Sequence, residues 1–249
     1  MRKLLVIILL LGTFINHSEA KIQAGIGINV GPNFGRMNNE FLKGKLSTAG
    51  GTLSFVPGVH AAIQGRIWIN KFVGVNLGIE FNMGGSSYTK YSGAGNVISS
   101  NKTHKENQLT IPVTIMAGWG NQRLRVFANA GGYFGYNISG TDVRTINNNG
   151  SVQPKVSEKA DYKEVYNNID AGVRMGAGIQ VYVSKDLRSS VTFDMNYDFG
   201  LVKTFRGAVD PFYNNSTKLK LYNSKFNIGV GYMYTFGKNQ AEEQPKTGL

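Results

Sequence analysis

The chain has 249 residues, a formal net charge of +12 at neutral pH and no cysteine. This length fits one large all-β domain or two ordinary domains. The lack of cysteine excludes a disulfide-stabilised scaffold, a thiol nucleophile and a cysteine-ligated metal site, and three histidines argue against a histidine-rich metal site. The basic charge is compatible with nucleic acid or with an anionic lipid surface.

Residues 1–20 predict a secretory signal peptide. Arg2 and Lys3 form a basic start, an apolar run follows, and small residues precede an expected cleavage between Ala20 and Lys21. An uncleaved anchor helix is the alternative, but the apolar run is short for a membrane span. Because export separates the chain from the genome, we expect no nucleic acid partner.

The rest of the chain repeats one pattern, in which apolar residues alternate with polar residues or glycine. A period of two predicts strands with two different faces. No segment keeps a period of 3.6, so we expect no long helix. The expected strands cover 22–34, 57–69, 72–85, 107–119, 123–139, 165–183, 189–202 and 223–236.

The connections between these segments alternate in length. The short turns are 70–71, 120–122 and 184–188, and the long polar loops are 35–56, 86–106, 140–164 and 203–222. Both chain ends lie beside the short turns. This connectivity predicts an all-β fold, an eight-stranded antiparallel up-and-down β-barrel over 21–236, followed by a short periplasmic tail over 237–249.

The composition of the two faces indicates the surroundings of the barrel. One face is almost free of charge, and its apolar strips reach the ~9–11 residues that a transmembrane strand needs. The strips end in aromatic residues, as expected for interfacial girdles: Trp119, Tyr136, Phe199 and Phe236. We therefore predict a transmembrane barrel in a bacterial outer membrane. The alternative is a soluble periplasmic, lipocalin-like barrel that binds a small apolar ligand.

Three segments carry a family resemblance. They are 109–115, which contains the step Ile111-Pro112, then 124–135, and the glycine-rich 170–179. Together they resemble the PorT-type outer-membrane β-barrel family, whose domain is the outer membrane protein β-barrel domain. The resemblance implies a non-enzymatic barrel in the bacterial outer membrane and, from the namesake of the family, an accessory role in protein secretion. The tail after Phe236 departs from barrels that stop at the terminal aromatic residue.

Charged residues on the polar face form the most distinct group of candidate functional residues. They are Arg66, Glu80, Asp170, Arg174, Asp194 and Asp198. An ion path would use such charges, but eight strands leave a lumen filled by side chains. Isolated buried charge is costly, so pairing is expected. We predict a structural network in which each arginine pairs with one of the four acids.

An enzyme needs a nucleophile and an orienting base. His60 is the one histidine expected on a strand, and no Gly-x-Ser-x-Gly motif accompanies it. We therefore expect no catalytic residue, no cofactor and no metal, and a lipid-modifying outer-membrane enzyme remains a third alternative.

The last long loop has a basic surplus. Lys203, Arg206, Lys218 and Lys220 stand against Asp210. These cations suit lipopolysaccharide phosphates, although solvated loops would show the same bias. We expect a monomeric barrel with a structural or interaction role at the envelope, whose partners are outer-membrane lipid, lipopolysaccharide and an envelope protein.

Overall fold

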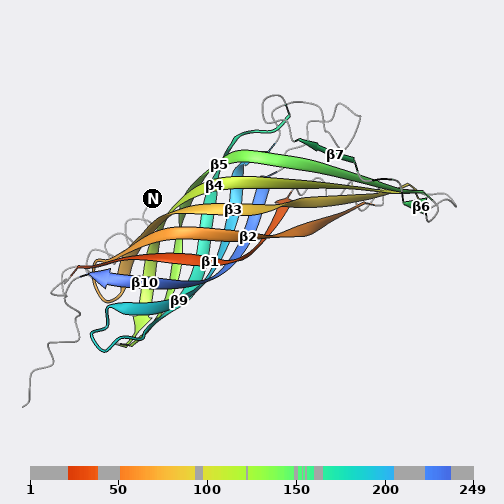
Figure 1. Ribbon diagram of the computed structural model, residues 1–249. Coiled ribbons are helices and arrows are strands. Elements are labelled where there is room, and N and C mark those ends of the chain that lie inside the picture. Colours follow the sequence, from red (N-terminus) through yellow and green to blue (C-terminus); the bar gives the residue numbers. More distant parts are fainter. Residues whose placement is uncertain are drawn as a thin grey trace, which may run out of the picture.

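The computed structural model describes residues 22–38, 51–92, 98–121, 123–148, 151–152, 154, 156–159, 165–204 and 222–236. None of these ranges holds a helix with the length and hydropathy of a transmembrane span. The strands within them form one sheet (Figure 1). They are β1 Gln23–Asn38, β2 Gly51–Trp68, β3 Val73–Ser92, β4 Ile98–Gly120, β5 Leu124–Asn148, β6 Ser151–Val152, β7 Val156–Lys159, β8 Ile169–Tyr182, β9 Ser189–Lys203 and β10 Tyr222–Phe236.

Eight of these strands close into a barrel. Their order is β4-β3-β2-β1-β10-β9-β8-β5, and β4 also pairs with β5, which completes the ring. All pairings are antiparallel, and the first strand meets the last one in register, with Ala24 opposite Phe236. The predicted eight-stranded up-and-down barrel is confirmed. The two short strands β6 and β7 pair with β5 outside the ring.

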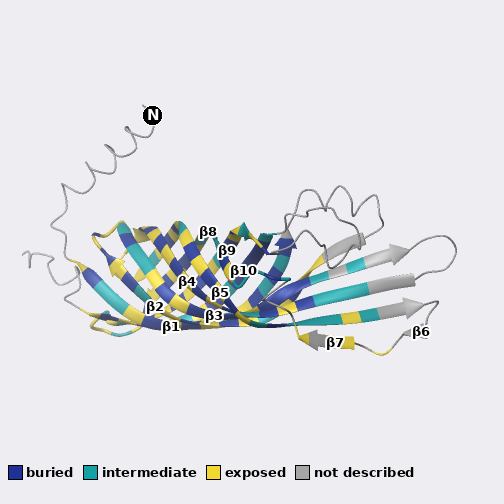
Figure 2. Cartoon of the chain, turned by 90° about the horizontal axis from the view of Figure 1, so that it is seen from above, coloured by how far each residue is buried: buried dark blue, intermediate teal, exposed yellow. Residues whose placement is uncertain are grey.

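The two faces of each strand have opposite character, which gives the striped colouring of Figure 2. On β4, Ile111, Val113 and Ile115 are exposed on the outside, whereas Thr110 and Thr114 are buried in the lumen. A soluble barrel would bury its apolar face, but a membrane barrel presents that face to lipid. The apolar outer surface therefore forms a lipid-facing belt, as predicted.

Five strands, β1 to β5, run four residues or more beyond the bounds that the sequence predicts, and the last four of them run furthest. β2, β3, β4 and β5 enter the predicted loops 35–56, 86–106 and 140–164, and they project beyond the other barrel strands (Figure 1). The prediction of loops there was wrong because the outside of the sheet no longer touches lipid, so the apolar alternation ends while strand pairing continues. We call this projection the extracellular extension. It comprises 51–55, 86–92, 98–106 and 140–148, together with β6 and β7.

Candidate functional site: the barrel lumen and its outer mouth

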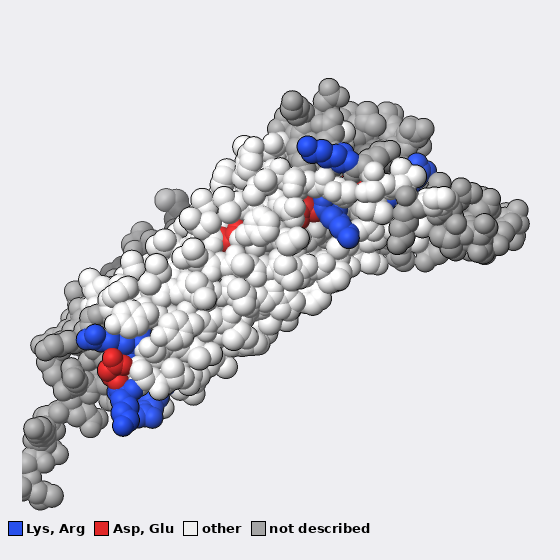
Figure 3. Space-filling model, viewed as in Figure 1, with Lys and Arg blue, Asp and Glu red and all other residues white. Residues whose placement is uncertain are grey.

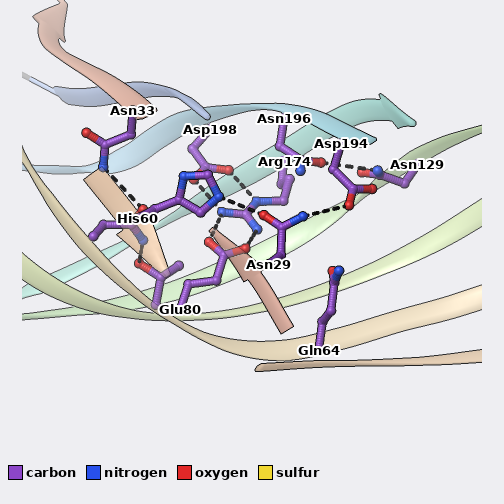
Figure 4. Close-up of polar contacts among 12 residues, drawn as sticks. Asn29, Asn33, His60, Gln64, Glu80, Asn129, Arg174, Asp194, Asn196 and Asp198 are labelled. Atoms are coloured by element: carbon purple, nitrogen blue, oxygen red, sulfur yellow. Dashed lines mark hydrogen bonds and ion pairs between the residues drawn. The ribbon is translucent and has the colours of Figure 1, made fainter. Parts of the chain in front are cut away.

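Arg174 forms the centre of the filled lumen. It lies on β8, and its guanidinium donates hydrogen bonds to both oxygens of Asp198 on β9 and both oxygens of Glu80 on β3, at 2.5–2.7 Å (Figure 4). β3 is three strands from β8 around the ring, so the contact with Glu80 crosses the lumen. Paired forks of this kind are the strongest charge-assisted hydrogen bonds. They hold two opposite walls together.

A second ion pair lies nearer the end of the barrel that carries the short turns, which we call the turn end. Arg66 Nη2 on β2 donates to Asp194 Oδ1 on β9 at 2.6 Å, again three strands away. Asp194 Oδ2 accepts from Asn29 Nδ2, and Asn29 Oδ1 lies 2.9 Å from His60 Nε2 (Figure 4). His60 is thus buried within a hydrogen-bonded chain, where it contacts an amide rather than a nucleophile.

Asp170 has different partners from the other predicted charges. It accepts hydrogen bonds from Gln108 Nε2 at 3.1 Å and from the Tyr133 hydroxyl at 3.3 Å, and neither arginine reaches it. All six predicted lumen charges are buried. The structure brings five of them into two ion-paired groups, while Asp170 lies closer to the outer mouth.

Apolar side chains close the lumen at the turn end, and sequence reasoning missed them. Trp68, Met116 and Phe127 point inward and form a buried cluster. The Trp68 and Phe127 rings meet edge to face at 6.3 Å, and the Arg125 guanidinium lies 4.3 Å from the centre of the Trp68 ring. The sequence did carry a signal for this cluster, because these apolar residues stand at positions of the polar face.

Two glycines make room for these large rings. A Cβ at Gly118 would lie 2.6 Å from Trp68 Cη2, and a Cβ at Gly178 would lie 2.5 Å from Phe127 Cζ. Any larger residue at either position would displace a ring. The glycines of the polar face therefore allow a crowded lumen rather than a nucleotide-binding loop.

A third ionic group closes the outer mouth. Lys225 Nζ on β10 lies 2.9 Å from Glu106 Oε1 on β4 and donates to Gln108 Oε1 at 2.5 Å. β10 is four strands from β4, which is the opposite side of an eight-stranded ring. Asn223 Nδ2 also reaches the Glu106 carboxylate at 3.4 Å. The mouth is therefore bridged across its full width.

His104 joins this bridge to the extracellular extension. Its Nδ1 lies 2.7 Å from Asp142 Oδ1 on β5, and its Nε2 lies 3.7 Å from Glu106 Oε2. The Tyr166 ring stacks on the imidazole at 4.3 Å, and its hydroxyl donates to Asp142. Lys102 Nζ lies 3.1 Å from the same carboxylate. This group is the mouth cluster: Lys102, His104, Glu106, Asp142, Tyr166 and Lys225.

The mouth cluster lies above the lipid-facing belt, which begins at Leu109 on β4. Burial by itself would lower the pKa of His104, but the Asp142 and Glu106 carboxylates raise it above its ordinary value. Burial would raise the pKa of Glu106, yet Lys225 and His104 lower it to about 2. His104 and Lys102 likewise lower the pKa of Asp142 against the effect of its burial. The cluster therefore favours a charged imidazolium between two carboxylates.

Sequence reasoning assigned His104 to a loop and so missed the mouth cluster. The signal was present, because positions 104 and 106 continue the inward alternation of 108 and 110. Of the predicted lipopolysaccharide contacts, Lys203 is exposed at the end of β9. Three further contacts and the signal cleavage site lie outside the described residues: Arg206, Lys218, Lys220, Ala20 and Lys21.

The chain is similar to a known protein family. A model of the family described as outer membrane protein beta-barrel domain matches residues 16–206. A comparison with curated proteins gives no match. Among solved structures, Neisserial surface protein A is 8% identical with a TM-score of 0.38, covering 86% of this chain and 97% of its own.

Two further solved structures show a similar likeness. Ail, the attachment invasion locus protein of Yersinia pestis, is 12% identical with a TM-score of 0.35, covering 86% of this chain and 99% of its own. The outer membrane protein OprG from Pseudomonas aeruginosa is 10% identical with a TM-score of 0.41, covering 86% of this chain and 94% of its own.

Proposed function

Because this chain belongs to the outer membrane protein β-barrel domain family and lies in the bacterial outer membrane, we propose that it is a non-enzymatic surface protein. In this proposal the barrel is a closed anchor, and the extracellular extension is the part that meets other molecules. The observation that carries the proposal is the bridged lumen.

The lumen is bridged at three levels by contacts between distant strands. Arg66 reaches Asp194, Arg174 reaches Glu80, and Lys225 reaches Glu106 across the ring. Eight strands already leave room only for side chains. An ion or solute would have to break buried, charge-assisted pairs at each level. These contacts support an anchor rather than a channel.

The extracellular extension supports an interaction role because its outward face is polar and ordered. Ser87 donates to Asn101 Oδ1 at 3.0 Å and lies 3.1 Å from the Thr103 hydroxyl. Asn101 Nδ2 donates to Thr89 at 3.3 Å. This network links β3 and β4 and keeps a hydroxyl- and amide-rich surface in place. Such a surface suits polar partners at the cell exterior.

Conductance measurements test the closed anchor. The full-length protein, inserted into planar bilayers, is expected to give no steady ion conductance. A variant that removes all three cross-lumen cations (Arg66→Ser, Arg174→Ser and Lys225→Ser) opens the path if it folds, which a boiling-dependent mobility shift on SDS–PAGE verifies. Steady conductance by the parental protein would overturn the anchor.

Lipopolysaccharide is the partner that the basic residues in and after the end of β9 suit best. Lys203 is exposed where β9 leaves the barrel, and Arg206, Lys218 and Lys220 follow it in the sequence. Cations recognise lipid phosphates through charge-assisted hydrogen bonds. These four residues are our proposed contact.

Binding of purified lipopolysaccharide tests this contact. Changing the four residues to glutamate should abolish binding to the detergent-solubilised protein. The matched control reverses four cations at the opposite end (Lys71, Arg123, Lys185 and Arg188 to glutamate) and should bind normally. Equal binding by both variants would remove lipopolysaccharide from the proposal.

An accessory role in protein secretion is the narrower part of the proposal. It is supported by the PorT-like segments, which lie in β4 around Ile111-Pro112, in β5, and in β8 from Asp170 onward. Deleting the gene should then reduce the amount of exported protein in the culture medium, and restoring it should recover that amount. Unchanged export would contradict the secretion role but not the surface role.

A further inference from the structure

The turn end of the barrel carries a concentrated positive charge. Lys71, Arg123, Lys185 and Arg188 are exposed in the turns that the structure places at 69–72, 121–123 and 183–188, and Asp186 is the only acid among the described residues of these turns. Four cations and one anion give a net charge of +3. Figure 3 shows basic side chains gathered at this end, beside a largely uncharged barrel wall. We call the four cations the basic turn rim.

The basic turn rim follows directly on the lipid-facing belt. Ile69 and Val183 are the last outward apolar residues before two of the turns, and Lys71 and Lys185 each lie only two positions further on. At ~3.3 Å per residue, two positions span at most about 7 Å. The headgroup layer on each side of a bilayer is about 5–7 Å thick. Lys71 and Lys185 therefore lie at the depth of the lipid phosphates.

The turns that carry these cations are held by hydrogen bonds. Asn70 Oδ1 accepts from the Phe72 amide at 2.8 Å, and Asn121 Oδ1 accepts from the Arg123 amide at 2.9 Å. Lys71 Nζ also lies 4.7 Å from the centre of the exposed Phe72 ring. The rim is thus presented from fixed backbone next to apolar surface, as an interfacial lipid contact requires.

We propose that the basic turn rim binds the phosphate groups of anionic phospholipids in the periplasmic leaflet. Anionic headgroups attract cations near a membrane surface, and the attraction is strong only within a Debye length. The depth of Lys71 and Lys185 places them within that range, and Arg123 and Arg188 belong to the same set of short turns. This contact is separate from the proposed surface role, which concerns the other end of the barrel.

Trp119 provides a reporter for this contact. The chain has two tryptophans. Trp119 points outward at the turn end and is 58% exposed, whereas Trp68 is buried in the lumen. Bromine atoms on lipid chains quench tryptophans that they touch, so quenching in a bilayer reports the lipids around Trp119. A Trp119→Phe variant should lose this quenching, which assigns the signal.

The experiment uses the full-length protein in phosphatidylcholine vesicles with a minor fraction of phosphatidylglycerol, brominated on one lipid or the other. We expect the lipid around Trp119 to be enriched in phosphatidylglycerol about fivefold over the bulk. Reversing the rim (Lys71, Arg123, Lys185 and Arg188 to glutamate) should abolish the enrichment, and high salt should weaken it in the parental protein.

A matched control separates this effect from net charge. Four exposed cations at the other end of the strands are Lys105, Arg144, Lys159 and Lys203. Changing these to glutamate alters the net charge equally but should keep the enrichment. A second rim variant with glutamine in place of glutamate covers the case in which reversal prevents folding. The proposal is overturned if the parental protein shows no enrichment, or if a folded rim variant keeps it.

Discussion

The same three strands, β3, β4 and β5, behave differently in the membrane and beyond it. In the barrel, an inward polar residue such as Gln108 is buried and contacts Asp170 on β8 and Lys225 on β10, two strands that do not neighbour β4. In the extracellular extension, Asn101 and Thr103 are only half-buried and bond to their immediate neighbours. Strand pairing is continuous through both regions. The difference teaches that enclosure by the other strands gives a polar contact its energetic weight.

The largest loss of stability is expected when Arg174 is replaced. Replacing it by methionine leaves Glu80 and Asp198 as two buried carboxylates with no cation between them. Breaking a buried pair in this way costs about 3–5 kcal/mol. Urea unfolding of the protein in lipid vesicles measures the free energy of unfolding.

The compensated variant is the control for this prediction. Arg174→Met combined with Glu80→Gln and Asp198→Asn removes the uncompensated charge, so it should recover much of the lost stability. If Arg174→Met alone unfolds like the parental protein, the lumen network is not structural.

Arg66 should matter less than Arg174, because it serves one carboxylate instead of two. Asp194 keeps its hydrogen bond from Asn29 when Arg66 is replaced by methionine. We expect a loss of about 2 kcal/mol. A double-mutant cycle with Asp194→Asn isolates the pair, and a coupling energy near zero would contradict a direct interaction.

The mouth cluster should make stability depend on pH. The pKa of His104 is higher in the folded protein, so its stabilisation is complete below about pH 6.5, the ordinary histidine value. It is lost as the pH rises through the folded pKa. Glu106 and Asp142 have lowered pKa values, so their contribution is present above about pH 4 and falls in acid. We expect an effect smaller than that of either arginine.

Unfolding measured from pH 5.5 to pH 9 checks this prediction. The parental protein should lose stability across this range more steeply than a His104→Gln variant. Thr103→Val serves as the control, because it removes no titratable group and should keep the slope of the parental protein. Parallel slopes for the parental and His104→Gln proteins would contradict a titrating His104.

The smallest effects come from a matched pair of threonines. Thr110 donates to Gln108 and accepts from Asn82 in the lumen, so Thr110→Val should cost about 1 kcal/mol. Thr103 makes comparable bonds in the extension, but solvent replaces them, and Thr103→Val should stay within about 0.5 kcal/mol. Equal losses of stability at the two positions would mean that enclosure does not decide how much these hydrogen bonds contribute.

Much of the barrel could be predicted because lipid imposes a rule on every spanning strand. Alternation placed Arg66, Asp194 and Arg174 in the lumen and Trp119 on the outside. The outer side of the extension followed no such rule, since it no longer meets lipid and carries no apolar alternation, and His104 was therefore assigned to a loop. The cross-lumen partners were also beyond prediction in detail. Alternation fixes the face of a residue but not the stagger of the strands, which decides that Arg66 meets Asp194 and Arg174 meets Glu80.

The pairing of β1 with β10 has a consequence for how the molecule forms. Ala24 can meet Phe236 only after every intervening strand has been delivered. Contacts between residues so far apart in the chain are slow to form. The open sheet that precedes them exposes two unpaired edges, which are prone to pair with another chain. Closure of this seam is therefore the step at which we expect assembly to need protection, and substitutions along β1 or β10 should affect the yield of folded protein more than its final stability.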